Sequence, residues 1–471
     1  MNNRSSSFDR QRNPRRCEQN NPVVQQAKAC HVVADVSTRR LRTSMLALAM
    51  FAALPMSNAA AASNELFGAS QQAGPAASAA QTKRIEHLKK QKTTASLRLV
   101  KIDIAALSGA SVQIPSSSAG LLTYVKTRTE TNGPHGFTWY GNLAGGPGNA
   151  ILVVHDGVVT GSVTENGNLS KIESVGEGSH AFIEINNAGF PEDHPTVLAS
   201  DRHFKSTTTA STTGTTATTG TTPTTATTAT TPTTATTTST VTAVAPTTID
   251  NKTIIDVMVA YPSTVASAVA DIAGLVTLAV AETNQAYINS GVRIQMNLVG
   301  AVPIAYSEAG KDYQTMLSDV TASPEVKLKR DSLGADVVIT LTTNPAYCGM
   351  AYLMPGADMA FGVVNYSCAT GYYSFGHEIG HIHGLQHDPV TSPGTYPVAY
   401  GHGYQSTNSS PSWRTIMAYN CSPSCTRLPY FSSPNQTYNG LAMGTPTVSD
   451  NARLLNETAT GVSLFRSSPA P

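Results

Sequence analysis

The second half of the chain alternates between continuous apolar runs and runs with helical spacing. The apolar runs predict three strands, at "TIIDVMVAY", "VRIQMNLVG" and "ADVVITLT". Apolar positions over roughly 265–290, among them Val276, Val280 and Tyr287, recur on one helix face, and a second helix is predicted near 311–332. Strands that alternate with helices in this way predict an α/β layered fold.

Residues 63–205 carry a different pattern. A polar, basic, helix-like piece, "TKRIEHLKKQK", comes first. Short alternating segments follow: "LRLVKIDI", "GFTWYGNL", "NAILVVHDGVVTGSV", "LSKIESV" and "AFIEI". Asn166-Gly167 is a strong signal for a two-residue hairpin, because both residue types adopt positive φ readily. These patterns predict a small β-rich domain.

A low-complexity stretch separates the two parts. Of the 43 residues 206–248, 26 are threonine, mostly in Thr-Thr-x triplets with Ala, Gly or Pro. Such a stretch has too few apolar side chains to offset the entropy lost on ordering. We therefore expect a threonine-rich linker over 206–249 and a second folded domain over 250–466.

The first 62 residues have the features of an export signal with a long basic extension. The apolar run at 45–54 follows Arg39, Arg40 and Arg42 and precedes the small-residue stretch "SNAAAAS". This order is typical of a secretory signal, and the alternative is a buried helix. The run is too short to span a bilayer. We therefore expect a secreted protein with no membrane span.

The charge balance gives no reason to expect a nucleic-acid partner. The chain has 31 basic and 30 acidic residues, a net charge of +1, and only 13% of its residues are charged. Nucleic-acid-binding domains usually carry a basic excess instead. Plentiful Gly, Ser, Thr and Pro fit a loop-rich, β-containing extracellular protein better than a helical cytosolic one.

Cysteine usage agrees with export. Of six cysteines, Cys17 and Cys30 precede the apolar run and would be lost with the signal. The other four lie in the last third of the chain: Cys348, Cys368, Cys421 and Cys425. Four cysteines in an exported domain predict two disulfides, for which three pairings are possible. Pairing between near neighbours, Cys348 with Cys368 and Cys421 with Cys425, is favoured.

The stretch "HEIGHIHGLQHD" at 377–388 carries the candidate chemistry. Residues four apart share one helix face, so His377 and His381 can bind one metal ion. Imidazole nitrogens suit Zn²⁺. Glu378 can reach a zinc-bound water and take its proton, since zinc lowers the pKa of that water toward about 7. This is the H-E-x-x-H motif of zinc peptidases.

Gly384 and His387 extend the motif. Glycine accepts a positive φ, so Gly384 lets the chain turn sharply and return His387 to the metal as a third ligand. Three protein ligands leave a fourth position for water, as a single catalytic zinc ion requires. The spacing disfavours the alternative, a histidine-rich surface helix. His383 is expected to be a surface or packing residue, and His402 a loop residue rather than a ligand.

Residues 377–388 together with Met417, thirty residues after His387, resemble the metzincin class of zinc proteases, which has a methionine turn beneath the metal. The position of Asp388, directly after the third histidine, is similar to that of an aspartate in the adamalysin (reprolysin) branch of this class. From about 250 to 460, "DVMVAYPS", "YCGMAYL", "GHGY", "RTIMAYNC" and "YFSSPN" in order resemble the bacterial peptidyl-Asp metalloendopeptidases. The resemblance does not include the threonine-rich linker.

The resemblance implies a fold and a mechanism. The fold would be a twisted mixed sheet with two long helices and an irregular lower subdomain. His377, His381 and His387 would bind zinc. Glu378 would be the general base and then the proton donor to the leaving amine.

The same resemblance implies supporting roles for residues around the motif. Met417 would form the hydrophobic floor of the site, and Asp388 would fix the loop of the third histidine to the lower subdomain. The edge strand near Cys348–Leu353 would pair with an extended peptide by strand addition.

Three residues past the motif are candidates with open alternatives. Tyr419, two residues after Met417, would ligate resting zinc or donate a hydrogen bond to the oxyanion, or would simply pack near the turn. Cleavage on the amino side of aspartate, the specificity of the family, requires a cation in the pocket. Arg427 is the first choice and Arg414 the second, because arginine pairs bidentately with a carboxylate. The alternative is a solvated surface arginine.

The domain at 63–205 is placed to act as a propeptide that inhibits the enzyme. It contains no cysteine after signal removal, so a lock on the site would use another group or simple occlusion. The segment "FPEDHP", with Asp193 and His194, is a candidate, and the alternative is an ordinary turn between Pro191 and Pro195. A retained substrate- or wall-binding module is the other role considered for this domain.

Together these features predict a secreted, monomeric zinc endopeptidase that is made as a zymogen and acts on proteins. The rival hypothesis is an adhesin on a threonine-rich stalk, with a metzincin-like domain that only binds. Glu378 argues against it, because a binding domain does not need that carboxylate. A zinc hydrolase of non-peptide bonds is a third hypothesis, which the edge-strand-like "YCGMAYL" disfavours.

Overall fold

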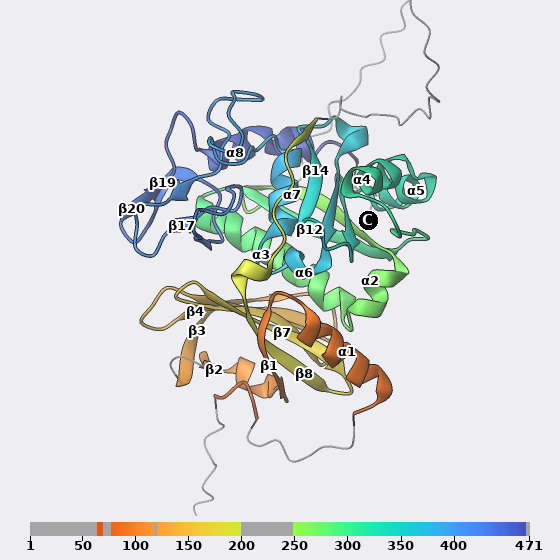
Figure 1. Cartoon of the computed structure of the whole chain (residues 1–471), viewed down its shortest axis with the longest axis vertical. Helices are drawn as coiled ribbons and strands as arrows, with labels where there is room; N and C mark the ends of the chain where they lie inside the picture. The colour runs from red at the N-terminus through yellow and green to blue at the C-terminus, as the bar shows by residue number, and fades with distance from the viewer. Residues whose placement is uncertain (1–63, 69–76, 117–119, 199–247, 468–471) are drawn as a thin grey trace, which may run out of the picture. The chain divides into compact units, whose positions relative to one another are not determined.

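A computed structural model of the chain describes residues 64–68, 77–116, 120–198 and 248–467. All of them belong to one compact unit, Ala61–Pro471. The predicted signal region with Cys17 and Cys30, and nearly all of the threonine-rich linker, lie outside the described residues. Figure 1 shows the described residues as two groups of strands, one coloured orange to yellow and the other green to blue.

The first group is an eight-stranded antiparallel sheet in the order β1-β8-β7-β6-β5-β4-β3-β2. Its strands are β1 (Thr94–Val100), β2 (Ser111–Ser116), β3 (Gly120–Thr131), β4 (Gly136–Leu143), β5 (Asn149–His155), β6 (Val158–Glu165), β7 (Asn168–Gly176) and β8 (Ser179–Ile185). The predicted hairpin joins β6 to β7, with Asn166 at φ 49° and Gly167 at φ 88°. The longest alternating segment is itself a hairpin, β5–β6, which turns at Asp156-Gly157.

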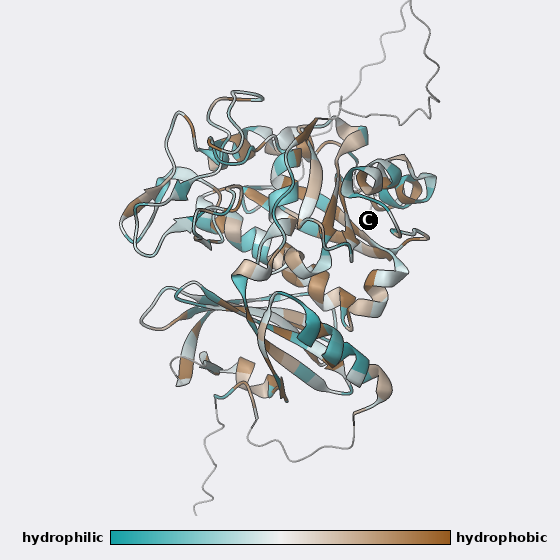
Figure 2. Cartoon of the chain, viewed as in Figure 1, coloured by the Kyte–Doolittle hydropathy of each residue, from teal (hydrophilic) through white to brown (hydrophobic). Residues whose placement is uncertain are grey.

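Helix α1 (Ala79–Lys90) packs against this sheet. It begins at Ser78, whose hydroxyl accepts a hydrogen bond from the N–H of Gln81 at 3.2 Å. Ile85 and Leu88 are its buried apolar side chains. Figure 2 shows teal over most of the helix, because its remaining side chains are polar or charged.

The second group is centred on a mixed sheet in the order β10-β11-β13-β15-β14-β9, with β12 paired to β11. Its strands are β9 (Val197–Leu198), β10 (Thr248–Ile249), β11 (Lys252–Tyr261), β12 (Ile294–Pro303), β13 (Val337–Thr342), β14 (Gly349–Leu353) and β15 (Phe361–Asn365). Strand β11 is parallel to β12 and β13, and β13 is parallel to β15. Strand β14 is antiparallel to β15. The three strands predicted from apolar runs form β11, β12 and β13.

Helices cover both faces of the mixed sheet (Figure 1). They are α2 (Ser263–Ala268), α3 (Ile272–Ser290), α4 (Tyr313–Ala322), α5 (Pro324–Leu333), α6 (Tyr366–Ala369), α7 (Ser374–Ile382) and α8 (Asn451–Val462). Alternate residues of β11 point to opposite faces, so Val257 packs with α3, α7 and α8 while Met258 packs with α4 and α5. None of the described helices is long and apolar enough to cross a membrane.

Two stretches predicted as single helices are each interrupted. The stretch 265–290 forms α2 and α3, because Asp271 starts a new helix by accepting a hydrogen bond from the N–H of Gly274 at 2.8 Å. The stretch 311–332 forms α4 and α5, because Pro324 lacks the N–H that would continue α4 and Ser323 caps the next helix. The apolar spacing continues across the first break, whereas Ser323-Pro324 is a typical helix start that marks the second break in the sequence.

Helix α3 is buried on two sides. One side belongs to the core of the mixed sheet. The other side packs against strands of the eight-stranded sheet in a small cluster made of Tyr140, Ile151, Val153, Leu278 and Ala281. Thr160 on β6 also donates a hydrogen bond to the carboxylate of Asp271, at 2.9 Å, where α3 begins. The helix therefore contributes to the cores of both sheets.

Most of the chain between α7 and α8 is irregular. Its short strands are β16 (Gln405–Ser406), β17 (Trp413–Arg414), β18 (Thr426–Arg427), β19 (Ser433–Tyr438) and β20 (Leu441–Met443). The structure contains disulfides Cys348–Cys368 and Cys421–Cys425, so the near-neighbour pairing is confirmed. The first of them ties the start of β14 to α6.

Replacing Leu455 with alanine should destabilise the fold. The side chain of Leu455 on α8 is fully buried in the core that α3, α7 and α8 share. Its loss leaves a cavity that costs about 2–5 kcal/mol. The thermal midpoint of the purified protein measures the effect. Leu464→Ala is the control, because Leu464 is 43% exposed, and equal shifts in both variants would contradict this packing.

Candidate active site

Helix α7 brings His377 and His381 to one face, fully buried beneath β14. Its glycines allow this close packing. A Cβ atom on Gly380 would lie 2.6 Å from the sulfur of Met417. The side chain of Met417 is fully buried, so the methionine predicted to form the floor of the site lies directly against the helix that carries the histidines.

The chain turns back at Gly384, which has φ +91°. The N–H of Leu385 donates to the carbonyl of Gly380 at 2.9 Å, which closes the end of the helix. This left-handed conformation is the one that glycine adopts at little cost. The turn returns His387 to the two histidines of α7.

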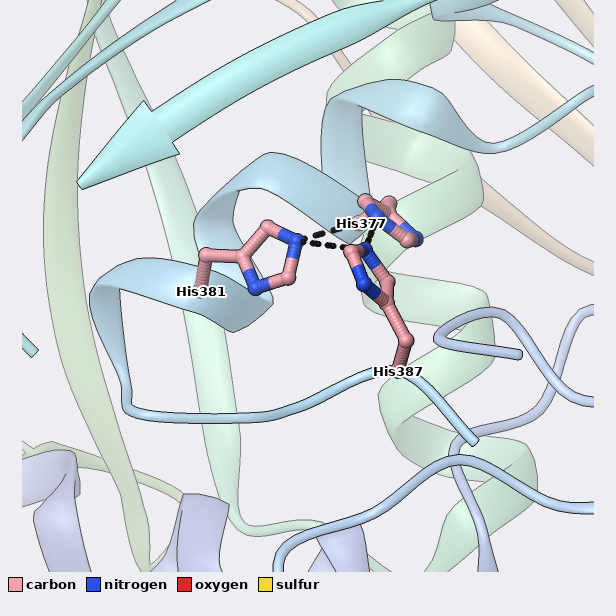
Figure 3. Close-up of side chains that lie close together, drawn as sticks. All are labelled: His377, His381 and His387. Carbon is pink, nitrogen blue, oxygen red and sulfur yellow. Dashed lines mark hydrogen bonds between the residues drawn. The ribbon is translucent and has the colours of Figure 1, made fainter. Parts of the chain in front are cut away.

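The three imidazoles converge on one position (Figure 3). The Nε2 atom of His381 lies 3.1 Å from the Nε2 atoms of His377 and His387, and these two lie 3.2 Å from each other. Their Nδ1 atoms face protein oxygens: Ile416 O at 2.9 Å from His377, Leu385 O at 2.8 Å from His381 and Ser392 Oγ at 3.3 Å from His387. With the proton on Nδ1, the Nε2 lone pair of each ring points at this common position. At His377 the Nδ1 atom also lies 2.6 Å from Arg427 Nη2.

The three histidines of the cluster are held in their neutral form, which is the form that binds a metal ion. Burial lowers the pKa of His381 to about 4 and holds the pKa values of His377 and His387 well below the usual range. Neutral imidazoles are the form that binds metal, and three nitrogen ligands are typical of catalytic zinc. Among the described residues, these three histidines are the group of His, Cys, Asp and Glu side chains close enough to share one ion.

Glu378 follows the first histidine and is almost completely buried. Its Oε2 atom has no hydrogen-bond partner among the described residues. Burial, and then the negative charge of Asp193, raise the pKa of Glu378 well above its usual value. Strand β14 approaches closely, since a Cβ atom on Gly349 would lie 2.3 Å from Glu378 Oε1. The carboxylate therefore lies between the histidine helix and the strand.

Asp388 holds the loop of the third histidine in place. Its carboxylate accepts hydrogen bonds from the N–H of Tyr419 at 3.1 Å and from the hydroxyl of Thr391 at 2.9 Å. The first of these connects the loop to the segment that carries Met417. The predicted anchoring role of Asp388 has this contact as its physical basis.

Tyr419 lies against the cluster of three histidines. Its ring centroid is 4.3 Å from that of His387. Its hydroxyl is buried and has no hydrogen-bond partner among the described residues. Burial raises the pKa of the phenol above its ordinary value, so the hydroxyl keeps its proton at neutral pH. A buried, protonated hydroxyl beside the cluster can donate a hydrogen bond to a substrate.

Arg427 and Arg414 are neighbours and are both buried, with side chains 2% and 1% exposed. Arg427 Nε donates to Ile416 O at 2.9 Å, the carbonyl that also accepts from His377. Arg414 Nη2 donates to the hydroxyl of Tyr372 at 2.7 Å. Neither arginine is solvated at the surface, which was the alternative that the sequence analysis considered. Tyr372 belongs to no motif, so no sequence pattern singles it out.

The remaining histidines of the region make other contacts. His383 Nδ1 lies 2.8 Å from the hydroxyl of Thr458 on α8. His402 lies 2.9 Å from the carbonyl oxygens of both His387 and Gly394. Of the two alternatives for His383, the structure shows packing and excludes a surface position, and His402 lies in a loop outside the cluster of three histidines.

Comparison with known proteins agrees with this geometry. Residues 251–432 match the model of Metallo-peptidase family M12. The peptidyl-Asp metalloendopeptidase of Stenotrophomonas maltophilia (strain K279a) is 33% identical over 404 residues, which cover 79% of this chain and 87% of that protein. The peptidyl-Asp metalloendopeptidase of Xanthomonas campestris pv. campestris is 31% identical over 432 residues, which cover 87% of this chain and 95% of that protein.

Both alignments are longer than the second domain, so the likeness includes part of the N-terminal region as well. The sequence motifs alone had limited it to about 250–460. The solved structure titled "Crystal Structure of metalloproteinase-II from Bacteroides fragilis" matches with a TM-score of 0.34 and 10% identity, over 63% of this chain and 84% of that one.

Substituting the two histidines at 383 and 387 separately should separate metal binding from packing. His387→Gln removes one of three converging nitrogens, so the protein should lose its zinc on dialysis against a mild chelator. His383→Gln should retain zinc, because its imidazole faces Thr458. The bound metal is measured by atomic spectroscopy. Zinc retained by His387→Gln, or lost equally by both variants, would contradict the ligand set.

Proposed function

The chain belongs to the family of bacterial peptidyl-Asp metalloendopeptidases, and on that premise we propose that it is a secreted zinc endopeptidase that cuts proteins on the amino side of aspartate. The meeting of three neutral imidazoles beside a buried, unpartnered carboxylate oxygen carries this proposal. Metal-assisted hydrolysis of a peptide bond needs both parts, a Lewis acid and a base within reach of the same water.

His377, His381 and His387 would hold one Zn²⁺ ion through their Nε2 atoms. The fit is good, because the three atoms are 3.1–3.2 Å apart and the opposite side of each ring faces a protein oxygen. When bound, zinc supplies Lewis acidity that lowers the pKa of water and polarises a carbonyl.

Glu378 would act as the base and then as an acid. Its free oxygen is the group placed to accept a proton from the attacking water. The same carboxyl group would then deliver that proton to the nitrogen of the leaving amine. Burial raises the pKa of this carboxyl group, which makes the carboxylate a stronger base and lets it hold the accepted proton until the amine leaves.

Two further elements would position the substrate. Strand β14 is the natural partner for an extended peptide, because it lies outermost among the strands that residues 252–365 contribute to the sheet. Tyr419 would donate its hydroxyl hydrogen to the oxygen that becomes negative in the transition state. Met417 and Asp388 would support the site without touching the substrate.

Arg427 and Arg414 would supply the preference for aspartate. Two buried guanidinium groups beside a zinc ligand create a strongly positive position next to the scissile bond. A carboxylate on a short side chain pairs well with such donors. The relatives carry peptidyl-Asp in their names, and this pair of arginines is a physical basis for the same preference here.

The regions before the catalytic domain would direct export and keep the enzyme inactive until it is processed. The signal-like region at 1–62 lies outside the described residues, and its basic flank and apolar run support secretion. The domain at 63–205 would act as an inhibitory propeptide, and the linker at 206–249 would join it to the catalytic domain at 250–466.

Glu378→Gln should reduce kcat by about 10²–10⁴-fold without loss of zinc. The amide keeps the shape of the side chain but cannot accept the proton. Rates are measured on an unstructured polypeptide with purified, processed protein, and zinc content is measured in the same samples. A variant that keeps its zinc and its full rate would exclude Glu378 as the base.

Arg427→Ala should weaken cleavage before aspartate selectively. We expect the ratio of kcat/KM for an Asp peptide to that for the matched Asn peptide to fall about thirtyfold or more, since a buried charge pair is lost. The ratio cancels any general damage to the zinc site. Arg453→Ala is the control, because that arginine lies on the exposed face of α8. An unchanged ratio in Arg427→Ala would remove this residue from the pocket.

A further inference from the structure

The N-terminal domain ends in a segment that follows strand β14 past the active site. We name residues 190–198 the blocking segment. The N–H of Cys348 donates to the carbonyl of Glu192 at 3.1 Å. Further along, Val197 and Leu198 form β9 and pair with Tyr352 and Leu353 of β14 in parallel. The segment therefore occupies the strand edge where a substrate would add.

Within this segment, the side chain of Asp193 turns into the site. It is 6% exposed and lies between the two buried arginines. Its Oδ1 is 3.3 Å from Arg427 Nη1, and its Oδ2 is 3.3 Å from Arg427 Nη2 and 3.6 Å from Arg414 Nη1. The carboxylate of Asp193 thus contacts Arg427 in a bidentate manner, and the guanidinium of Arg414 lies beside it as a second positive group.

An aromatic stack supports the same contact. The ring of Phe190 stacks on the ring of Tyr372 with centroids 4.0 Å apart. The guanidinium carbons of Arg427 and Arg414 lie 4.8 Å and 5.4 Å from the same Tyr372 ring. Tyr372 therefore contacts both arginines as well as the blocking segment.

This arrangement has the features of a binding site for one carboxylate. Two adjacent guanidinium groups repel each other and lose their hydration when buried, so a partner anion is needed. Burial and then Arg427 lower the pKa of Arg414, which shows that the pair is electrostatically unfavourable by itself. Among the described residues, Asp193 is the carboxylate paired with both arginines.

We propose that Asp193 is an intramolecular stand-in for the aspartate of a substrate, held in a pocket formed by Arg427, Arg414 and Tyr372. The inference rests on the proposed function, because it identifies the occupant of the proposed specificity pocket. The blocking segment then inhibits in two ways: its backbone covers the edge of β14, and its carboxylate fills the pocket. Arg414 becomes the second half of the aspartate site.

A direct bond from Asp193 to the metal is the competing arrangement. The described cluster of metal-ligand side chains contains the three histidines and does not include Asp193. The carboxylate oxygens of Asp193 face Arg427 instead. The two arrangements differ in their consequences, since loss of a metal ligand weakens zinc binding whereas loss of a pocket occupant does not.

The test measures peptide binding to the full, zinc-loaded chain carrying Glu378→Ala, in which self-cleavage is prevented. A fluorescent peptide with a single aspartate is titrated, and anisotropy gives its dissociation constant. Adding Asp193→Asn should tighten binding about tenfold or more, because the pocket is vacated for the carboxylate of the peptide. A peptide with asparagine in place of aspartate should gain much less.

Asp156→Asn in the same background is the matched control. It makes the same chemical change in the same domain, at an exposed turn where asparagine tolerates the φ of 47°. Its peptide affinity should stay unchanged. If Asp193→Asn does not fold, Asp193→Ser, which is smaller and admits water, takes its place with the same expectation.

Three outcomes would overturn the inference. Peptide affinity could stay the same in the folded Asp193 variant, the asparagine peptide could gain as much as the aspartate peptide, or the variant could lose zinc to a chelator more easily than its parent. The proposed function is checked separately with processed wild-type protein. If that protein cuts no peptide, the function fails, whereas cutting before aspartate alongside an unaffected Asp193 variant removes only the inference.

Discussion

Three imidazole nitrogens must meet at a single position, and much of the surrounding structure serves this constraint. The spacing of His377 and His381 on α7 places two of them, and the turn at Gly384 returns His387 to within 3.2 Å. The carbonyls and hydroxyl behind the rings orient each imidazole. Burial keeps the rings neutral, at the cost of excluding the water that would otherwise solvate them.

The same low-dielectric environment makes the charges beside the cluster interact strongly. Burial is the main reason for the raised pKa of Glu378, and the charge of Asp193 raises it further. The guanidinium of Arg427 adds to the depression of the pKa of His377. Glu378, His377 and the two arginines are therefore electrostatically connected, so the carboxylate of Asp193 between the arginines also influences Glu378.

The sequence predicted the cluster of three histidines and the main strands better than it predicted the helix breaks and the long-range side-chain contacts. Spacing alone identified the three histidines, and apolar runs located β11, β12 and β13. The break at Asp271 was obscured by apolar spacing that continues across it, whereas the break at Ser323-Pro324 carries a sequence signal that the single-helix prediction overlooked. The pairing of Asp193 with Arg427 joins residues 234 positions apart, and no local pattern reports such a distance. Tyr372 was missed for the same reason, since a lone tyrosine carries no signal until its neighbours are known.

Helix α3 has a consequence for solubility. It gives one side to each of two cores, so Leu278 and Ala281 are covered by the strands that carry Tyr140, Ile151 and Val153. Any form of the protein that has lost residues 64–198 brings this apolar stripe into contact with water. Such a form has an exposed apolar surface that is buried in the intact chain. Its tendency to aggregate will therefore rise with its concentration.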